Sequence, residues 1–413
     1  MTQDAFLRDL FATAVRVADP MQSLAPYLPP KPEGRVVVIG AGKASARMAE
    51  AVEAEWGPCD GLVITRYGYA RPCQGIEIVE ASHPVPDAAG VEATQRLLAL
   101  LDTVGEGDFV LALISGGGSA LLCAPVDGVT LQEKQDLTAG LLASGAPIGT
   151  INGIRKEISA VKGGRLATAA YPAQMLALMI SDVPGDHPGD IASGPTVGHD
   201  GSAARAIAEL DRWGVTPSPS IAAYLAQGGD PVRPDDPRLG TTTNVIYAAP
   251  SHSLNEAADH GRTAGYTTRM LGDAIEGEAR DVAAAHAALA MDAASGTLIL
   301  SGGELTVTRR GDGVGGPNAE YALALAIALD GAANIHAIAC DTDGVDGAAE
   351  VAGAVIGPDT LAKARAKGLD AQDFLDRNDA HTFFQLIDDQ VVPGPTLTNV
   401  NDFRAIVVGT PAA

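Results

Sequence analysis

Short runs of β-branched and aliphatic residues alternate along the chain with longer segments in which apolar residues recur every three or four positions. The short runs predict buried strands, and the longer segments predict helices that cover a sheet with one apolar face. Ala44, Met48, Val52 and Trp56, for example, form one such stripe. This alternation predicts an α/β fold of parallel strands joined by crossover helices. The expected strands are 36–39, 62–65, 76–79, 109–114 and 175–180, then 244–248, 297–300, 335–339, 383–387 and 405–408.

The stretch 214–240 separates the two series of strands and contains five prolines among polar residues. Prolines at this density interrupt regular structure, so a domain boundary is expected there. The length of 413 residues also suits two domains, at roughly 150 residues per domain. We therefore expect a first domain at 1–238 and a smaller second domain at 239–413.

Composition narrows the class of partner. The net charge is −23, from 28 basic and 51 acidic residues, which argues against nucleic acid and anionic membrane surfaces as partners. A small anionic ligand in a local basic pocket stays compatible with this charge. The start of the chain lacks the pattern of a signal peptide, and no run approaches the ~18 apolar residues of a membrane span. The four cysteines show no metal or disulfide spacing. A cytoplasmic enzyme is expected.

The segments that follow the expected strands are small, polar or acidic. VVVI runs into GAGKAS, FVLALI into SGGGS, MLALMI into SDVPGD, TLIL into SGGE and IHAIA into CDTDGVDG. Ligands of open parallel sheets bind beyond the carboxyl ends of the strands. Turn chemistry would explain any one of these loops, but five loops from both halves predict a site in a cleft between two domains.

GAGKAS at 40–45 resembles the dinucleotide fingerprint GxGxxG, but Ser45 stands in place of the third glycine. It also lacks two residues of a Walker A loop. Gly40 and Gly42 allow close backbone approach, and a helix that begins near Lys43 offers free N–H groups to an anion. Lys43 adds a full charge; the alternative is a solvated surface lysine.

SGGGS at 115–119 is the stronger phosphate-binding candidate. Three successive glycines can turn their N–H groups inward around an anion, and two serine hydroxyls can add donors. The alternative is a tight strand-to-helix turn. The predicted nucleotide-binding residues of this loop are Ser115, Gly116, Gly117, Gly118 and Ser119.

Carboxylates accompany the glycine-rich loops. Such groups suit Mg²⁺ held jointly with substrate phosphates, or a base that accepts a proton from a hydroxyl. Helix caps and Asx-turns are the alternative for some of them. The candidates are Asp182, Asp186, Glu304, Asp341, Asp343 and Asp346.

The segment NGIRKEISAVKGGR at 152–165 brings four cations into an acidic chain: Arg155, Lys156, Lys162 and Arg165. Arginine offers bidentate geometry to a carboxylate or phosphate, and lysine offers a point charge. The alternative is a helix surface with ordinary ion pairs.

Ten motifs, in order, resemble the class II glycerate 2-kinase family over essentially the whole chain. They include GAGKAS, HPVPD, SGGGSAL, NGIRKEISAVKGGRLA, SDVPGD, SGGE, GGPNAEYALALA, DTDGVDG and GPTLTNVNDF. The resemblance implies a Rossmann-like three-layer N-terminal domain and a smaller C-terminal α/β domain of the MOFRL type, with the active site in the interdomain cleft. It also implies transfer of phosphate from ATP with Mg²⁺ to the 2-hydroxyl of D-glycerate, which gives 2-phosphoglycerate.

Roles follow from the resemblance motif by motif. Lys43 corresponds to the active-site lysine, and Asp182, Glu304, Asn318 and Asp343 correspond to polar positions that line the cleft. Asp182 and Asp343 are the candidate catalytic and metal-binding carboxylates, and Glu304 and Asn318 the candidate nucleotide contacts. His83, Arg155, Lys156 and Arg165 are the candidate substrate-binding residues.

One departure from the family pattern is Pro317, where many relatives carry the arginine of GGRN. If that arginine stabilises the transferring phosphoryl group, Arg155, Arg165 or Arg280 must supply the charge here.

Two other functions stay open. An NAD(P)H-dependent hydroxypyruvate reductase would use the Rossmann-like start, with Arg66 near a 2′-phosphate and His83 as the acid. A nucleotide sensor would bind ATP without turnover. The sequence leaves a monomer or a homodimer open.

Overall fold

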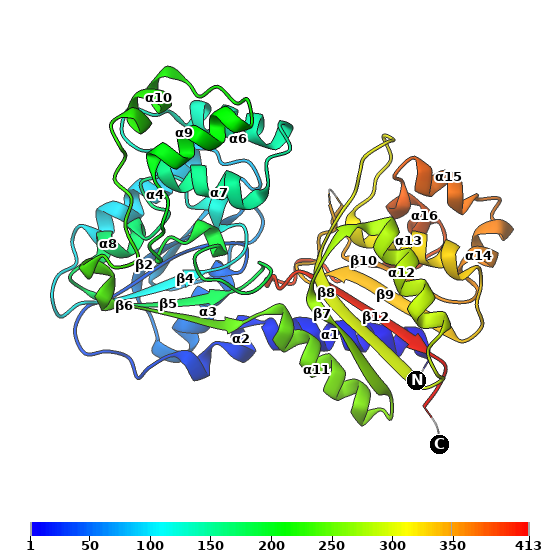
Figure 1. Cartoon of the computed structure of the whole chain (residues 1–413). Helices are drawn as coiled ribbons and strands as arrows, with labels where there is room; N and C mark the ends of the chain where they lie inside the picture. The colour runs from blue at the N-terminus through cyan, green and yellow to red at the C-terminus, as the bar shows by residue number, and fades with distance from the viewer. Residues whose placement is uncertain (1, 348, 412–413) are drawn as a thin grey trace. The chain divides into compact units, whose positions relative to one another are not determined.

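The computed structural model describes residues 2–347 and 349–411, which divide into two compact units (Figure 1). The continuous unit is Ser23–Tyr247, and the split unit combines Met1–Gln22 with Ala248–Ala413. This division differs from the expected boundary near 238. The expected first strand of the second domain is β6 (Thr242–Ala248), which completes the sheet of the continuous unit.

The continuous unit is built on a six-stranded sheet with the order β3-β2-β1-β4-β5-β6. The pairings from β3 to β5 are parallel, and the order is that of dinucleotide-binding doubly wound folds. The other strands are β1 (Val36–Ala41), β2 (Asp60–Arg66), β3 (Ile76–Ala81), β4 (Phe109–Ile114) and β5 (Gln174–Ile180). The helices are η1 (Ala25–Tyr27), α3 (Ser45–Trp56), α4 (Ala88–Leu101), α5 (Gly118–Leu121), α6 (Leu131–Ala143), α7 (Ile148–Glu157), α8 (Arg165–Ala170), η2 (Ile191–Ser193), α9 (Ala203–Arg212), α10 (Pro219–Ala226) and η3 (Pro237–Thr241).

Helices cover both faces of this sheet. Val37, Ile39 and Ala41 of β1 pack with Leu97 of α4 and Leu166 of α8 in one apolar cluster. Helix α3 contacts β1, β2 and β4 but contributes no residue to that cluster. Because successive side chains of a strand point to opposite faces, α3 lies on the other face. The three layers are those that the resemblance implied.

Helices α6, α7, α9 and α10 gather around an apolar cluster of their own (Figure 1). The proline-rich stretch 214–240 lies within the continuous unit and contributes to this cluster, so it is not a linker between the units. Pro219 occupies the first turn of α10 and Pro237 the first turn of η3. Proline is tolerated at these positions because the N–H groups there have no partner within the helix.

The split unit has a second six-stranded sheet with the order β11-β10-β9-β12-β8-β7. Its strands are β7 (Thr267–Glu278), β8 (Thr297–Thr306), β9 (Ile335–Asp341), β10 (Gly353–Ile356), β11 (Gln390–Val391) and β12 (Asp402–Val408). Its helices are α1 (Gln3–Ala18), α2 (Pro20–Ser23, at the boundary between the units), α11 (Pro250–Thr263), α12 (Ala279–Met291), α13 (Pro317–Leu329), α14 (Thr360–Ala366), α15 (Ala371–Asp376) and α16 (Ala380–Leu386). The chain is thus a two-domain α/β protein.

Our expectation of parallel strands is wrong for most of this second sheet. Only β7 and β8 pair in parallel in the described part of the unit; β12 runs antiparallel to both β8 and β9, and β10 is antiparallel to β9 and β11. The expected strand 383–387 is also wrong, because it lies in α16. Phe383 and Phe384 are buried there, and a short apolar run does not separate a buried strand from a buried helix.

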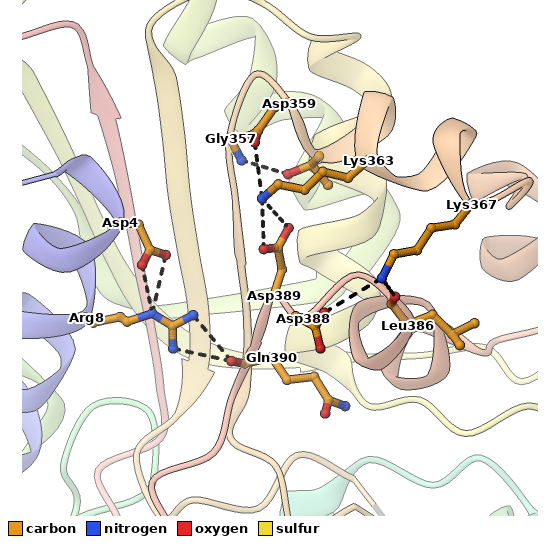
Figure 2. Close-up of polar contacts among 11 residues, drawn as sticks. Asp4, Arg8, Gly357, Asp359, Lys363, Lys367, Leu386, Asp388, Asp389 and Gln390 are labelled. Carbon is orange, nitrogen blue, oxygen red and sulfur yellow. Dashed lines mark hydrogen bonds and ion pairs between the residues drawn. The ribbon is translucent and has the colours of Figure 1, made fainter.

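Helix α1 packs in the split unit although it begins the chain. Leu7 and Leu10 share a buried cluster with Leu254 of α11 and with β8, β9 and β12. The guanidinium of Arg8 donates to the carbonyl of Gln390 in β11 at 3.3 Å and pairs with Asp4 at 3.1 Å (Figure 2). The first residues of the chain therefore complete the fold of its second half.

Within residues 2–347 and 349–411, each helix is too short or too polar to cross a lipid bilayer.

Candidate active site

The loops after β1 and β4 interlock where the strand order of the continuous unit reverses. The N–H of Lys43 donates to the carbonyl of Gly116 at 2.8 Å, and the N–H of Ala44 donates to Oγ of Ser115 at 3.0 Å. The point of reversal is where doubly wound sheets bind their ligands. GAGKAS and SGGGS, which are 70 residues apart in the sequence, therefore form one hydrogen-bonded structure.

Part of each glycine-rich sequence serves this interlock. Ser115 is fully buried, and its hydroxyl lies 3.1 Å from Oγ of Ser45. Gly42 has φ 148°, and a Cβ there would overlap the Ser115 hydroxyl. Gly40 lies within β1 against Leu113. Direct contacts of Gly40, Gly42 and Ser115 with a nucleotide stay predictions, and the structure gives these residues a positioning role.

Lys43 and His83 converge on the middle of the second loop. Gly117 has φ 79°, and a Cβ there would lie 3.0 Å from Cδ2 of His83 and 3.1 Å from Cγ of Lys43. His83 arrives from the loop after β3, and two strands, β2 and β1, lie between β3 and β4. The structure thus brings together three elements that the sequence proposed for the site.

The far end of this loop contacts the basic segment. Oγ of Ser119 lies 2.6 Å from Oγ of Ser193, and Nη2 of Arg155 donates to the Ser119 carbonyl at 3.1 Å. Nη1 of Arg155 donates to Asn152 at 3.3 Å. The Nε of Arg155 is buried and has no hydrogen-bond partner among the described residues.

Lys156 and Arg165, the other two predicted substrate-binding cations, make local contacts. Arg165 donates to the carbonyls of Lys156 and Asp230, both at 2.7 Å. The ammonium of Lys156 lies 3.7 Å from the carboxylate of Asp190. These contacts fix the segment after α7, and a contact of either side chain with substrate stays a prediction.

Two buried lysines interact electrostatically with Arg155. Lys162 is fully buried, and its Nζ donates to the carbonyl of Leu122 at 3.0 Å. Lys134 is 3 % exposed, and its Nζ has no partner in the described part of the chain. Burial, with the positive charges of Arg155 and Arg165, lowers the pKa of Lys134 to about 8.

The sequence analysis missed Lys134, although a signal was present. Lys134 stands three and seven residues before Leu137 and Leu141, which are the buried positions of α6. A lysine on the apolar stripe of a helix is unusual, because lysine is almost never fully buried unless it is paired.

Asp182 follows β5 at the same edge of the sheet and is partly exposed. Asp186, four residues later, has φ 52°, and its Oδ1 is buried without a hydrogen-bond partner among the described residues. Asp182 and Asp186 therefore both lie in the loop after β5, where the sequence placed them.

In the split unit, acids after β9 form turns. Asp341 accepts the N–H of Asp343 at 2.9 Å, and Oδ1 of Asp343 accepts the N–H of Val345 at 2.8 Å. Asp343 is 1 % exposed. The Asx-turn alternative therefore accounts for part of this acidic loop, and metal binding by Asp343 stays a prediction.

Asn318 is a buried anchor of the first turn of α13. Its N–H donates to Asp346 at 3.0 Å and its amide nitrogen donates to Asp402 at 2.6 Å. Asp346 also accepts the N–H of Ala319 at 2.8 Å, and Arg404 pairs with Asp402 at 3.0 Å. The structure assigns the amide nitrogen of Asn318 to this network. A contact of Asn318 with a nucleotide stays a prediction.

We expected Glu304 in a loop, but it lies in a strand, because β8 continues through SGGE to Thr306. Its side chain is exposed, opposite Glu276 of β7. Its role toward a nucleotide stays a prediction.

Within residues 2–347 and 349–411, no group of three or more His, Cys, Asp or Glu side chains is placed to hold a metal ion. Asp182 belongs to the continuous unit and Asp343 to the split unit. Their convergence in an interdomain cleft stays a prediction.

Comparisons with known proteins give the family of the chain. Residues 6–226 match a family described as a domain of unknown function, DUF4147, and residues 297–402 match the MOFRL family. D-glycerate 2-kinase of Thermotoga maritima is 34% identical, with 95% of each chain covered. The solved structure of glycerate kinase from Thermotoga maritima has a TM-score of 0.88 and 32% identity, and covers 98% of this chain and 99% of that chain.

The chain belongs to the class II glycerate kinase family. A protein of Agrobacterium vitis with the provisional name hydroxypyruvate reductase is 48% identical, over 98% of this chain and 94% of that protein. The two names are those of the two enzyme activities that the sequence left open.

In this member of the glycerate kinase family, Pro317 is the first residue of α13. Of the three arginines that could replace the missing charge, Arg280 pairs with buried Glu320 at 2.6 Å, and Arg165 donates to backbone carbonyls. Of these three arginines, Arg155 alone has a buried N–H without a hydrogen-bond partner among the described residues.

Proposed function

We propose that this protein transfers the γ-phosphoryl group of ATP to the 2-hydroxyl of D-glycerate and forms 2-phosphoglycerate. The observation that carries the proposal is the interlock of GAGKAS with SGGGS, which brings Lys43 and His83 together at Gly117. Family membership supplies the reaction class, and the interlock supplies a rigid site for it.

Phosphoryl transfer asks a protein mainly for positioning and for stabilisation of charge. Lys43 would stabilise the charge on the transferring phosphoryl group, and the SGGGS loop would position the phosphates. His83 would hold the glycerate hydroxyls. Arg155 would hold the glycerate carboxylate and supply the positive charge that Pro317 does not.

Asp182 and Asp343 carry the oxygen donors that Mg²⁺ prefers, and Mg²⁺ usually completes its ligands with water and substrate phosphates. When bound, the ion would neutralise charge on the phosphates. Asp182 is partly exposed at a strand end and fits this use. Oδ1 of Asp343 accepts the N–H of Val345, and the Asp343 carboxylate would also contact the ion. A monomeric or dimeric state and a cytoplasmic location stay predictions from the sequence.

A hydroxypyruvate reductase is the second candidate, favoured by the name of the Agrobacterium vitis relative. A dinucleotide fold needs its second glycine open, so that the pyrophosphate can approach the backbone. In this chain the Ser115 hydroxyl fills the space beside Gly42. Ser45, in place of the third glycine, is buried and donates to the carbonyl of Leu113 at 2.9 Å. Both observations support the kinase.

The experiment that separates the two functions runs them side by side. Purified protein is mixed with ATP, Mg²⁺ and D-glycerate while ADP is followed, and in parallel with hydroxypyruvate and NADH or NADPH. We expect ADP formation that depends on D-glycerate and no loss of nicotinamide absorbance. Loss of that absorbance without ADP formation would replace the kinase by the reductase, and ATP binding without either reaction would indicate a sensor.

A further inference from the structure

We propose that Lys134 and Arg155 together bind the carboxylate of the acid substrate, and that Lys134 selects substrates that carry a carboxylate. This inference rests on the proposed function, because it names a subsite of the same site. Lys134 lies on α6 and Arg155 on α7, and these two helices contact one another.

Lys134 is buried although no described group pairs with its ammonium. Its Nζ has no hydrogen-bond partner in the described part of the chain. Among the described groups that act electrostatically on it, Arg155, Arg165 and Lys162 are positive, and Cys123 contributes a thiol. A buried charge is costly unless it is paired. A bound anion would supply the partner that the described residues do not give the Lys134 ammonium.

The second argument is the contrast with Lys162. Both lysines are buried, but the Nζ of Lys162 donates to the carbonyl of Leu122 at 3.0 Å. That bond gives Lys162 a structural role at the end of a short helix. Lys134 makes no such bond to the described residues, so the fold itself does not explain its ammonium group.

The third argument is the position of Arg155. Two of its nitrogens donate to Asn152 and to the Ser119 carbonyl, while its Nε is buried without a partner among the described residues. Ser119 lies two residues after Gly117, where Lys43 and His83 converge. Arg155 therefore links the uncompensated charge to the loop of the proposed site.

The chemistry of the two donors favours a carboxylate. An ammonium and a guanidinium N–H can each donate to one oxygen of a carboxylate, with the added strength of charge-assisted bonds. Lys43 already supplies a cation on the phosphate side of the loop.

The test is Lys134→Met, which keeps the length of the side chain and removes the charge. We expect the KM for D-glycerate to rise about 10- to 100-fold, as for the loss of a bond to a charged group. The KM for ATP should stay within about twofold, and kcat within about threefold. The Tm should stay the same or rise, because the variant no longer buries an unpaired charge.

Two variants serve as controls. Lys31→Met removes a surface ammonium that donates to the carbonyls of Trp56 and Pro58, and it should leave both KM values unchanged. Lys162→Met removes a buried ammonium with a structural bond, and it should lower the Tm. If Lys134 had only a structural role, Lys134→Met would lower the Tm as Lys162→Met does.

A measurement on the unaltered protein covers the case in which Lys134→Met does not fold. The Kd for D-glycerate should weaken above pH 8, approaching tenfold per pH unit, while glycerol should show no measurable binding. Cys123, Arg155, Arg165 and Lys162 face the same region. Cys123→Ser, which removes the thiol that acts on Lys134, should retain the pH profile.

An unchanged KM for D-glycerate in Lys134→Met, or a rise confined to the KM for ATP, would overturn the inference. So would a Kd for D-glycerate independent of pH between 7 and 10. Failure of the proposed function is recognised separately, as absence of ADP formation by the unaltered protein. In that case, calorimetric binding of D-glycerate to the unaltered protein and to Lys134→Met still decides the subsite.

Discussion

At the scale of single residues, Lys43 is the group whose position the structure explains most fully. Its backbone is held by the Gly116 carbonyl, and the bond from Ala44 to Ser115 follows directly. Its side chain lies against Gly117. A cation on a backbone fixed in this way costs little reorganisation when charge develops in a transition state.

Replacement of Lys43 by alanine should lower kcat by about 10²–10³-fold, the range for loss of one preorganised charge stabiliser. The Tm should change little, since the interlock uses backbone atoms of this residue. Steady-state kinetics of Lys43→Ala with D-glycerate and ATP measure this effect, beside Lys31→Ala as a surface control. Near-normal turnover would remove Lys43 from the mechanism.

His286 gives a prediction for pH dependence. It is 5 % exposed, and its Nδ1 lies 2.8 Å from the Tyr321 hydroxyl. Burial and the nearby charge of Arg404 lower the pKa of His286 to about 4. The unfolded chain therefore binds more protons between pH 6.5 and about 4, so the free energy of unfolding falls as pH falls through this window.

The contribution of one such histidine is at most about 1.4 kcal/mol per pH unit. Urea unfolding of the unaltered protein and of His286→Phe at pH 7, 5.5 and 4.5 should show a shallower decline for the variant. Equal slopes for both proteins would mean that His286 does not titrate in this window.

Lys134 and Ser115 show why the site could be predicted only in part. The motifs identified Lys43, His83 and the SGGGS loop, because local sequence marks a strand end and a turn. The partner of the Ser115 hydroxyl lies 71 residues away in sequence, so no local pattern predicts that this serine is internal. The lack of a partner for Lys134 depends on the packing of α6 and α7.

At the scale of elements, a carboxylate from another loop caps the first turn of α13. Asp346 accepts the N–H groups of Asn318 and Ala319, and it pairs with His381 at 3.1 Å. Gly316 lies against the same carboxylate. Asp346 is thus a helix cap supplied from 28 residues beyond Asn318.

Asp346→Ala should lower the free energy of unfolding by about 1–3 kcal/mol, because it removes a cap and leaves buried donors unpaired. Asp370→Ala removes the exposed cap of the short helix α15, where the carboxylate accepts the N–H of Gln372, and should cost less. Chemical denaturation compares the two variants. A larger loss for Asp370→Ala would contradict this reading of α13.

The elements of the continuous unit follow the sequence pattern more closely than those of the split unit. Parallel strands buried on both faces give continuous apolar runs, as in β1 and β4. Strand β7 was not predicted, because TTRMLGDAIEGE is polar and half-exposed. Its pairing with β8 includes register shifts around Gly272, which disturb any alternation.

At the scale of the whole molecule, the chain order and the structural units do not coincide. Helix α1 buries Leu7, Leu10 and Phe11 against α11 and the second sheet. The apolar periodicity of α1 predicts a buried face, but it does not predict which sheet that face will cover. For this reason the expected domain at 1–238 differs from the observed division.

Leu10→Ala should therefore destabilise the split unit by about 2–5 kcal/mol, the cost of a cavity at a buried leucine. Hydrogen exchange should show faster exchange in α11, β9 and β12, with the continuous unit unchanged. Faster exchange confined to the strands of the continuous unit would contradict the assignment of α1.

We propose phosphoryl transfer to the 2-hydroxyl of D-glycerate as the reaction of this protein. The most direct measurement is the ³¹P spectrum of the product formed from ATP, Mg²⁺ and D-glycerate by the unaltered protein. We predict a phosphate ester whose phosphorus couples to the single proton on carbon 2. Coupling to the two protons on carbon 3, or the absence of any phosphate ester, would contradict the account.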